Sequence, residues 1–265
     1  MAYEVNSAVA AGRLTRDPRI SYTAGEHSIA IAQFTLAVDR GRDTVDYISC
    51  RCIGKNAEFM EKHRKKGDPV AVSGIIRTGS YAGRDGKTVY TMDVDADTVT
   101  SEQKGNLKLN IIVIAGRLTR DPDVRVTANG TKMARFTLAV NRPFHKRIEK
   151  NVDETDFINC IAYNDNADFV EKLKKGSAIA VIGAIRTGSY TRSDGEKVYT
   201  KDVVADTIRY ATVRDVPQPG EGQLYQNAQA PVQDAVPQGN EGDDQLSMED
   251  WVQGDYDLPE ELPFT

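Results

Sequence analysis

The sequence predicts an all-β protein, and two observations support that fold class. Runs of residues typical of strands, separated by turn signals rich in Gly, Asp, Asn and Pro, fill the chain up to about residue 212. Ile-Arg-Thr-Gly-Ser-Tyr also occurs twice, at 76–81 and 185–190, and each copy is followed by Asp-Gly and then Val-Tyr-Thr. A strand-like run, an Asp-Gly pair and a second strand-like run are typical of a β-hairpin, so the same hairpin is predicted twice.

The repeat extends beyond the hairpin. Gly-Arg-Leu-Thr-Arg-Asp-Pro occurs at 12–18 and 116–122, and Phe-Thr-Leu-Ala-Val occurs at 34–38 and 136–140. A period above about 100 residues indicates duplication of a whole domain, because solenoid repeats have periods of about 20–50 residues. We therefore expect one domain over residues 1–100, a connector over 101–109 and a second domain over 110–212.

Each copy is predicted to contain three strands, a short helix and two further strands. In the first copy the strands cover 5–14, 29–38, 47–53, 70–78 and 88–99, and the helix covers 56–66, which the second copy repeats at 166–175. Five strands with a helix between the third and fourth give the order of the OB fold, a small closed barrel. Alternation places Ile48, Cys50 and Cys52 inside the first barrel, and it favours packing of Tyr90 and Tyr199 within the two barrels.

The motifs of several enzyme classes are absent from the sequence. There is no GxxxxGK[ST] phosphate loop and no HExxH helix, and the three cysteines, Cys50, Cys52 and Cys160, form no pair with zinc spacing. A small, odd number of cysteines without a secretory signal at the start predicts reduced thiols and a cytoplasmic protein. We expect a binding protein that is not an enzyme and uses no cofactor or metal.

The net charge of −5 is unevenly distributed. Residues 1–100 carry +1, residues 101–214 carry +6 and residues 215–265 carry −12, with no Lys or Arg in the last segment. A basic body predicts a polyanionic ligand, and the acidic end predicts a separate role. Residues 213–247 are poor in large apolar residues and are expected to be a disordered linker. Residues 248–265 surround a few hydrophobic residues with acids, which is typical of a docking peptide.

Aromatic and basic residues recur along the predicted outer face of both barrels. Aromatic rings stack on bases of any sequence, and cations neutralise phosphates, so the pattern predicts sequence-independent binding of a single strand. Arg77 and Tyr81 share one face of a hairpin arm, and the longer loop before the third strand of the second copy predicts stronger binding by that barrel. The candidate residues are Arg40, Arg42, Tyr47, Arg51, Arg77, Tyr81, Arg84, Lys87, Arg142, Phe144, Lys146, Arg147, Phe157, Tyr163, Arg186, Tyr190, Arg192 and Lys197.

In combination these motifs resemble the bacterial single-stranded-DNA-binding protein family, in a duplicated form with two OB domains. The matching features are the Gly-x-Leu-x-x-Asp-Pro opening, the Phe-Thr-Leu-Ala strand, the aromatic residue that begins the third strand, the Arg-Thr hairpin and the acidic end near Pro263-Phe264. Two features depart from the family pattern: Arg42 and Ile53 stand where aromatic residues are usual, and Thr265 follows the terminal Phe. The first barrel is therefore expected to stack fewer bases.

The resemblance implies protection of single-stranded DNA at the nucleoid during replication, recombination and repair. The family uses four OB domains, so two per chain imply a homodimer. It also implies that the acidic tip recruits partner enzymes through Asp255, Asp257, Glu260, Glu261, Leu262, Pro263 and Phe264. Two alternatives remain at this stage: an RNA-binding or RNA-chaperone OB protein, and an interaction scaffold that binds no nucleic acid.

Overall fold

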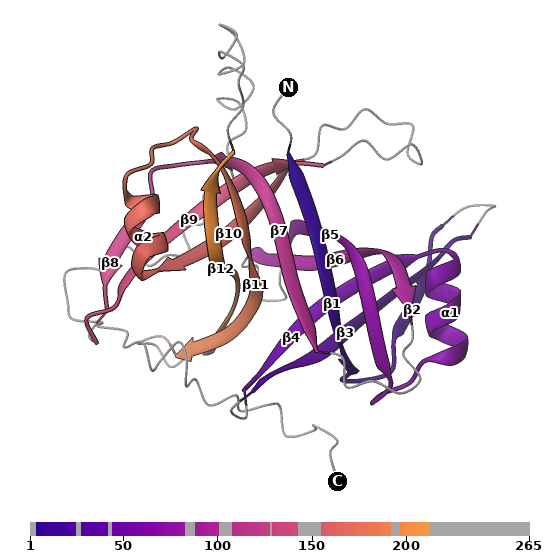
Figure 1. Cartoon of the computed structure of the whole chain (residues 1–265). Helices are drawn as coiled ribbons and strands as arrows, with labels where there is room; N and C mark the ends of the chain where they lie inside the picture. The colour runs from indigo at the N-terminus through magenta and orange to yellow at the C-terminus, as the bar shows by residue number, and fades with distance from the viewer. Residues whose placement is uncertain are drawn as a thin grey trace, which may run out of the picture.

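The computed structural model describes residues 4–24, 28–41, 44–82, 88–100, 108–127, 129–142, 155–191 and 197–211, and it is nearly all β (Figure 1). The first barrel contains β1 (Val5–Leu14), β2 (Arg19–Tyr22), β3 (Ala30–Gly41), β4 (Thr44–Ile53), α1 (Lys55–His63), β5 (Pro69–Ala82) and β6 (Thr88–Thr100). The second barrel contains β7 (Leu109–Leu118), β8 (Asp123–Val126), β9 (Lys132–Asn141), β10 (Thr155–Tyr163), α2 (Asn164–Glu171), β11 (Ala178–Thr191) and β12 (Lys197–Tyr210). The all-β fold class with two OB barrels is thus confirmed.

Each copy closes on itself. The strand order is β2-β3-β4-β6-β5-β1 in the first barrel and β7-β11-β12-β10-β9-β8 in the second, with the additional pairings β3–β1 and β7–β9 completing the circles. The pairings β4–β6 and β10–β12 are parallel, and in each case a helix and a further strand connect the two paired strands. The short edge strands β2 and β8 were not expected from the sequence, since four residues give too brief a pattern to detect.

The two barrels are joined into one sheet. Strands β1 and β7 pair antiparallel over seven residue pairs, from Val5 opposite Ala115 to Ala11 opposite Leu109. The junction is visible in Figure 1, where β1 and β7 lie side by side between the two barrels. The main chain therefore fixes the orientation of one barrel relative to the other.

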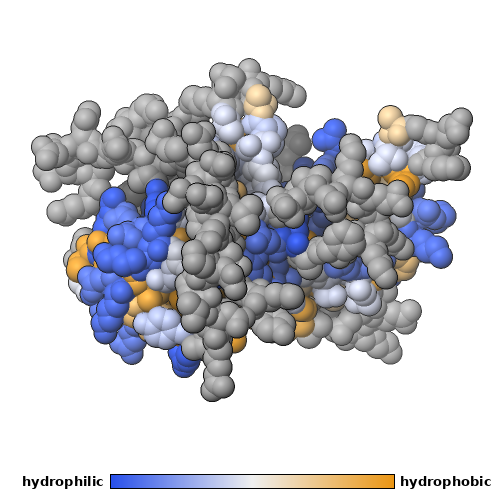
Figure 2. Space-filling view, turned by 90° about the horizontal axis from the view of Figure 1, so that it is seen from above, coloured by the Kyte–Doolittle hydropathy of each residue, from blue (hydrophilic) through white to orange (hydrophobic). Residues whose placement is uncertain are grey.

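Alternation along the strands separates the core from the surface, as expected. Ile48, Cys50 and Cys52 are buried in the first barrel, and their counterparts Ile158 and Cys160 are buried in the second. Seen from above, hydrophilic residues make up most of the described surface in view, and hydrophobic residues form small separate areas among them (Figure 2).

Both helices are shorter than predicted. Helix α1 ends at His63 and not at residue 66, because Arg64 has extended backbone angles. Gly67 then adopts a left-handed conformation with φ 85° and donates its N–H to the carbonyl of Leu14, which directs the chain into β5. Gly176, with φ 87°, makes the equivalent bond to Leu118 in the second barrel.

A glycine marks the bulge in each long hairpin. The register shifts between Ser73 and Gly74 in β5 and between Ile182 and Gly183 in β11. A Cβ atom on Gly74 would lie 2.0 Å from the carbonyl oxygen of Asp95, so only glycine permits this close approach of the strands.

Candidate nucleic-acid interface

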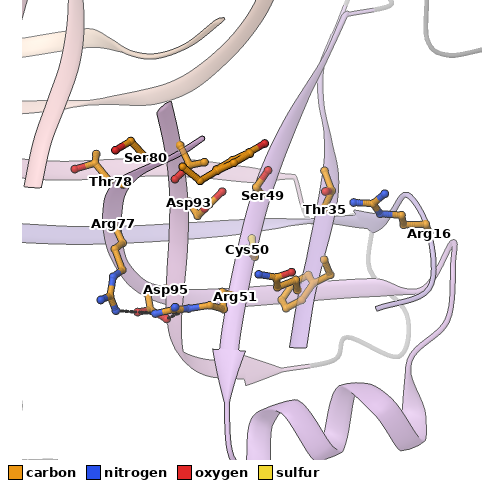
Figure 3. Close-up of a pocket in the computed structure, with 15 residues that line it drawn as sticks. Arg16, Thr35, Ser49, Cys50, Arg51, Arg77, Thr78, Ser80, Asp93 and Asp95 are labelled. Atoms are coloured by element: carbon orange, nitrogen blue, oxygen red, sulfur yellow. Dashed lines mark hydrogen bonds and ion pairs between the residues drawn. The ribbon is translucent and has the colours of Figure 1, made fainter. Parts of the chain in front are cut away.

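A groove of about 390 Å³ runs over the outer face of the first barrel (Figure 3). Most of its lining comes from β3, β4, β5 and β6, including outward residues and the edge of the buried core. The lining residues are Arg16, Gln33, Phe34, Thr35, Ser49, Cys50, Arg51, Arg77, Thr78, Gly79, Ser80, Tyr81, Thr91, Asp93 and Asp95. Three of the residues predicted from the sequence, Arg51, Arg77 and Tyr81, are brought together here.

An arginine–aspartate–arginine cluster, formed by Arg51, Asp95 and Arg77, occupies one side of the groove. Asp95 Oδ2 accepts hydrogen bonds from Arg51 Nη2 at 2.6 Å and from Arg77 Nη1 at 3.2 Å, and Oδ1 accepts one from Arg51 Nε at 3.3 Å. Figure 3 shows the carboxylate between the two guanidinium groups. Burial acts to raise the pKa of Asp95, but the hydrogen bonds and charges of both arginines outweigh burial and lower the pKa.

The second barrel also reaches the surface beside the groove. Lys201 of β12 donates a hydrogen bond from Nζ to Ser49 Oγ at 2.6 Å and lies 3.8 Å from Asp93 Oδ1. Burial lowers the pKa of Lys201, although the charge of Asp93 acts to raise it. Burial likewise raises the pKa of Asp93, although the charge of Lys201 acts to lower it. The sequence carries no local signal for this contact, because 108 positions separate Asp93 from Lys201.

Tyr47 and Phe157 lie near the starts of the equivalent strands β4 and β10, and both are half-buried where the hairpin of the other barrel crosses. The backbone N–H of Tyr47 donates to Thr187 Oγ1 at 3.1 Å, and that of Phe157 donates to Thr78 Oγ1 at 3.0 Å. These reciprocal bonds position the two predicted stacking rings at the junction between the barrels.

Two buried carboxylates, Asp46 and Asp156, anchor this junction. Asp46 accepts a hydrogen bond from Arg186 Nη1 at 2.8 Å and from the backbone N–H of Thr187 at 3.1 Å, and Arg40 Nη1 lies 3.7 Å away.

The equivalent Asp156 accepts hydrogen bonds from Arg142 Nε and Nη2, both at 2.8 Å, and from the backbone N–H of Thr78 at 2.7 Å. Arg40, Arg142 and Arg186, which the sequence suggested as phosphate ligands, therefore contact carboxylates at this junction. Their role toward a nucleic acid stays a prediction.

The second barrel has apolar residues at two of the positions where the first barrel has its charged cluster. Ile161 and Val204 are register partners there, at the positions that Arg51 and Asp95 occupy in the first barrel. The predicted Tyr163 is partly buried, and burial raises its pKa. Burial also raises the pKa of Asp202 to about 6, although the charge of Arg135 opposes the shift.

Two aromatic side chains on the hairpin arms are open to solvent. Tyr81 is 59% exposed, in agreement with its predicted place on the surface. Tyr199 is 68% exposed, so the expectation that it packs inside the second barrel was wrong. The arm extends past the closed part of the barrel, and alternation no longer points into a core there. Tyr199 is therefore an additional candidate for stacking.

Several predicted residues lie outside the described part of the chain. They are Arg42, Arg84, Lys87, Phe144, Lys146, Arg147 and Arg192, the whole tip from Asp255 to Phe264, and the side chains of Tyr190 and Lys197. Within the described residues, no group of three or more His, Cys, Asp or Glu side chains forms a metal site. None of the described helices has the length and apolar character needed to cross a membrane.

Comparison with known proteins agrees with both repeats. The model of the single-strand binding protein family matches residues 5–101 and again 109–211. The chain is 45% identical over 107 residues to the single-stranded DNA-binding protein of Halalkalibacterium halodurans, covering 40% of this chain and 62% of that protein. It is 47% identical over 104 residues to that of Clostridium perfringens, covering 38% of this chain and 65% of that protein. The chain thus spans less than two thirds of the length of these relatives.

Solved structures match over both barrels. A deletion mutant of the single-stranded DNA binding protein from Thermus aquaticus, which also carries one substitution of arginine by alanine, superimposes with a TM-score of 0.67 at 28% identity. That match covers 83% of this chain and 100% of the other. The wild-type Thermus aquaticus protein gives a TM-score of 0.63 at 26% identity, covering 83% of this chain and 98% of the other.

Proposed function

Because the chain belongs to the single-strand binding protein family, we propose that it binds single-stranded DNA without sequence preference and protects it during replication, recombination and repair. The observation that carries the proposal is that both family matches coincide with the two barrels. The relatives named above are described as single-stranded DNA-binding proteins. The proposed binding is non-covalent and involves no chemical reaction. The proposed place of action is the nucleoid in the cytoplasm.

The first barrel supports this proposal through the residues that line its groove. Arg16, Arg51 and Arg77 offer positive charge to phosphates, and exposed Tyr81 offers a ring for a base. Stacking contributes roughly 1–3 kcal/mol per base and tolerates every base, whereas a duplex keeps its bases stacked on one another. This chemistry selects unpaired strands over duplex DNA.

A fluorescence anisotropy titration tests the proposal. The full chain is added to a labelled oligo(dT) of about 50 nucleotides at low and high salt, with a duplex of equal length and oligo(U) as comparisons. We expect tight binding to oligo(dT), weakening as salt rises, and much weaker binding to duplex. Absence of binding at low salt would refute the proposal, and equal or better binding to oligo(U) would favour the RNA-binding alternative.

We propose further that two chains form a homodimer through the outer face of the joined sheet. Val9 lies opposite Ile111 across β1 and β7, and Val113 lies opposite Ile182 across β7 and β11, so these four apolar side chains share one surface. Ile111 and Ile182 are 46% and 47% exposed. A continuous apolar area on a sheet face is typical of a protein interface.

Light scattering tests the homodimer. We expect a mass of twice 29.2 kDa for the wild type and the mass of one chain for Ile111→Asp. Val126→Asp is the matched control, because Val126 is also an exposed strand residue but lies on the edge strand β8. A wild-type protein that stays a monomer would refute the homodimer.

The acidic tip is the proposed site for partner proteins of replication, recombination and repair. Its support is compositional: residues 257–265 place Leu262 and Phe264 next to a group of acids. Deletion of residues 257–265 should leave binding to oligo(dT) intact while abolishing capture of replication and repair enzymes. Retained capture by the shortened chain would exclude the tip from this role.

A further inference from the structure

The arginine of the repeated hairpin sequence has different partners in the two barrels. Arg186 pairs with the buried Asp46 at the junction between the barrels, with Nη1 and Oδ2 2.8 Å apart. Its counterpart Arg77 pairs with Asp95 in the groove, with Nη1 and Oδ2 3.2 Å apart. The two hairpins have the same local sequence around this arginine, so the difference must come from the surroundings.

Among the positions at which the surroundings differ is one pair of register partners. Arg51 in β4 lies opposite Asp95 in β6, and the equivalent positions in β10 and β12 hold Ile161 and Val204. A carboxylate at position 95 provides a partner for Arg77 in the groove, whereas Val204 provides none for Arg186. The repeat therefore contains a natural comparison between a charged pair and an apolar pair at the same place in the fold.

The Asp95 carboxylate lies between the two guanidinium groups, at the place where a bound anion would lie. One of its oxygens accepts hydrogen bonds from both arginines, and the second accepts another from Arg51. Guanidinium groups bind carboxylates and phosphates with the same planar donor geometry. All three side chains are only partly exposed, so their interaction is less screened than a fully exposed ion pair.

On the basis of the proposed function, we propose that Asp95 is an internal competitor of DNA phosphate in the groove of the first barrel. Arg51 and Arg77 form a binding site for one phosphodiester group, and the Asp95 carboxylate occupies that site when DNA is absent. The other carboxylate of the groove, Asp93, has a different cationic neighbour, Lys201 of the second barrel. Asp95 thus limits the affinity of the first barrel for a single strand and reduces its dependence on salt.

The test compares Asp95→Asn with Asp97→Asn in the full chain. Both substitutions remove one negative charge from β6, but the side chain of Asp97 is exposed, whereas Asp95 pairs with Arg51 and Arg77. Affinity for labelled oligo(dT) is measured by anisotropy over a range of salt concentrations. Asp95→Asn should bind about fivefold more tightly than wild type, and its salt slope should rise by about 0.7, the value for one additional phosphate on a single strand. Asp97→Asn should change affinity by less than about twofold, as for an exposed surface charge.

A second variant, Asp95→Val, introduces the residue of the second barrel and should also bind more tightly than wild type. Far-UV circular dichroism verifies that both variants are folded. If wild type binds oligo(dT) and neither variant exceeds the Asp97→Asn control, the competitor role of Asp95 is refuted and the proposed function stands. If wild type does not bind at all, both proposals fall.

Discussion

The junction between the barrels leads to a quantitative prediction for Asp156→Ala. The Asp156 carboxylate is fully buried and accepts four hydrogen bonds: two from Arg142, and one each from the backbone N–H and the hydroxyl of Thr78. Removing one member of a buried ion pair costs about 3–5 kcal/mol, because the remaining charge and donors stay away from water. The side chain of Arg142 is 16% exposed and cannot reach full solvation without moving, so we expect a loss within that range.

Urea unfolding followed by far-UV circular dichroism measures this loss. The control is Asp123→Ala, which removes an aspartate whose side chain is 42% exposed and whose ion pair with Arg125 spans 3.1 Å. An exposed pair contributes about 0–1 kcal/mol, so the control should unfold at nearly the wild-type urea concentration. If Asp156→Ala were no less stable than Asp123→Ala, the carboxylate would not hold the two barrels together.

Three further predictions concern the glycine bulge, the cysteines and the partly buried Asp202. Gly74→Ala should lower the free energy of unfolding by about 2 kcal/mol or more, because the added Cβ would meet a backbone oxygen. The control, Gly79→Ala, places its Cβ 3.4 Å from the nearest atom and should lower the free energy of unfolding by less than about 1 kcal/mol in the same urea assay. The three buried cysteine thiols should resist a thiol reagent at pH 8 until the chain is unfolded. Burial raises the pKa of each thiol, that of Cys52 to about 12, so little reactive thiolate is present. Rapid reaction of the folded protein would contradict this prediction. The folded-state pKa of Asp202, about 6, lies above its reference value of 3.8, so the stability from its bound proton is present below about pH 4 and is lost as the pH rises through 6. Asp202→Asn should therefore gain stability relative to wild type between pH 4.5 and 7.5, by at most about 3 kcal/mol, and a difference independent of pH would exclude this effect.

The sequence was sufficient for the fold because its signals are local. Strand alternation identified the buried face of β4, and the two Asp-Gly turns identified the hairpins whose arms became β5–β6 and β11–β12. The order of five strands and a helix then matched one known barrel. Strand alternation and the turn signals depend on residues within about 20 positions of one another.

The sequence was insufficient for the partners of the arginines. Arg186 meets Asp46 over a separation of 140 positions, which the packing of one barrel on the other makes possible. Alternation placed Arg51 and Arg77 on the outer surface of the first barrel, where both line one groove, but it could not show that one carboxylate binds both. Side-chain chemistry identified the candidate residues, whereas the three-dimensional contacts determine which charges are already paired.

Continuity of the sheet through β1 and β7 also affects how the protein can evolve. In an assembly of identical single-barrel chains, every substitution appears in all barrels at once, so each position must suit every location in the assembly. Here the two barrels are encoded separately and remain correctly matched because they are covalently linked and share main-chain hydrogen bonds. The two barrels can therefore carry different residues at equivalent positions, as Arg51–Asp95 and Ile161–Val204 do.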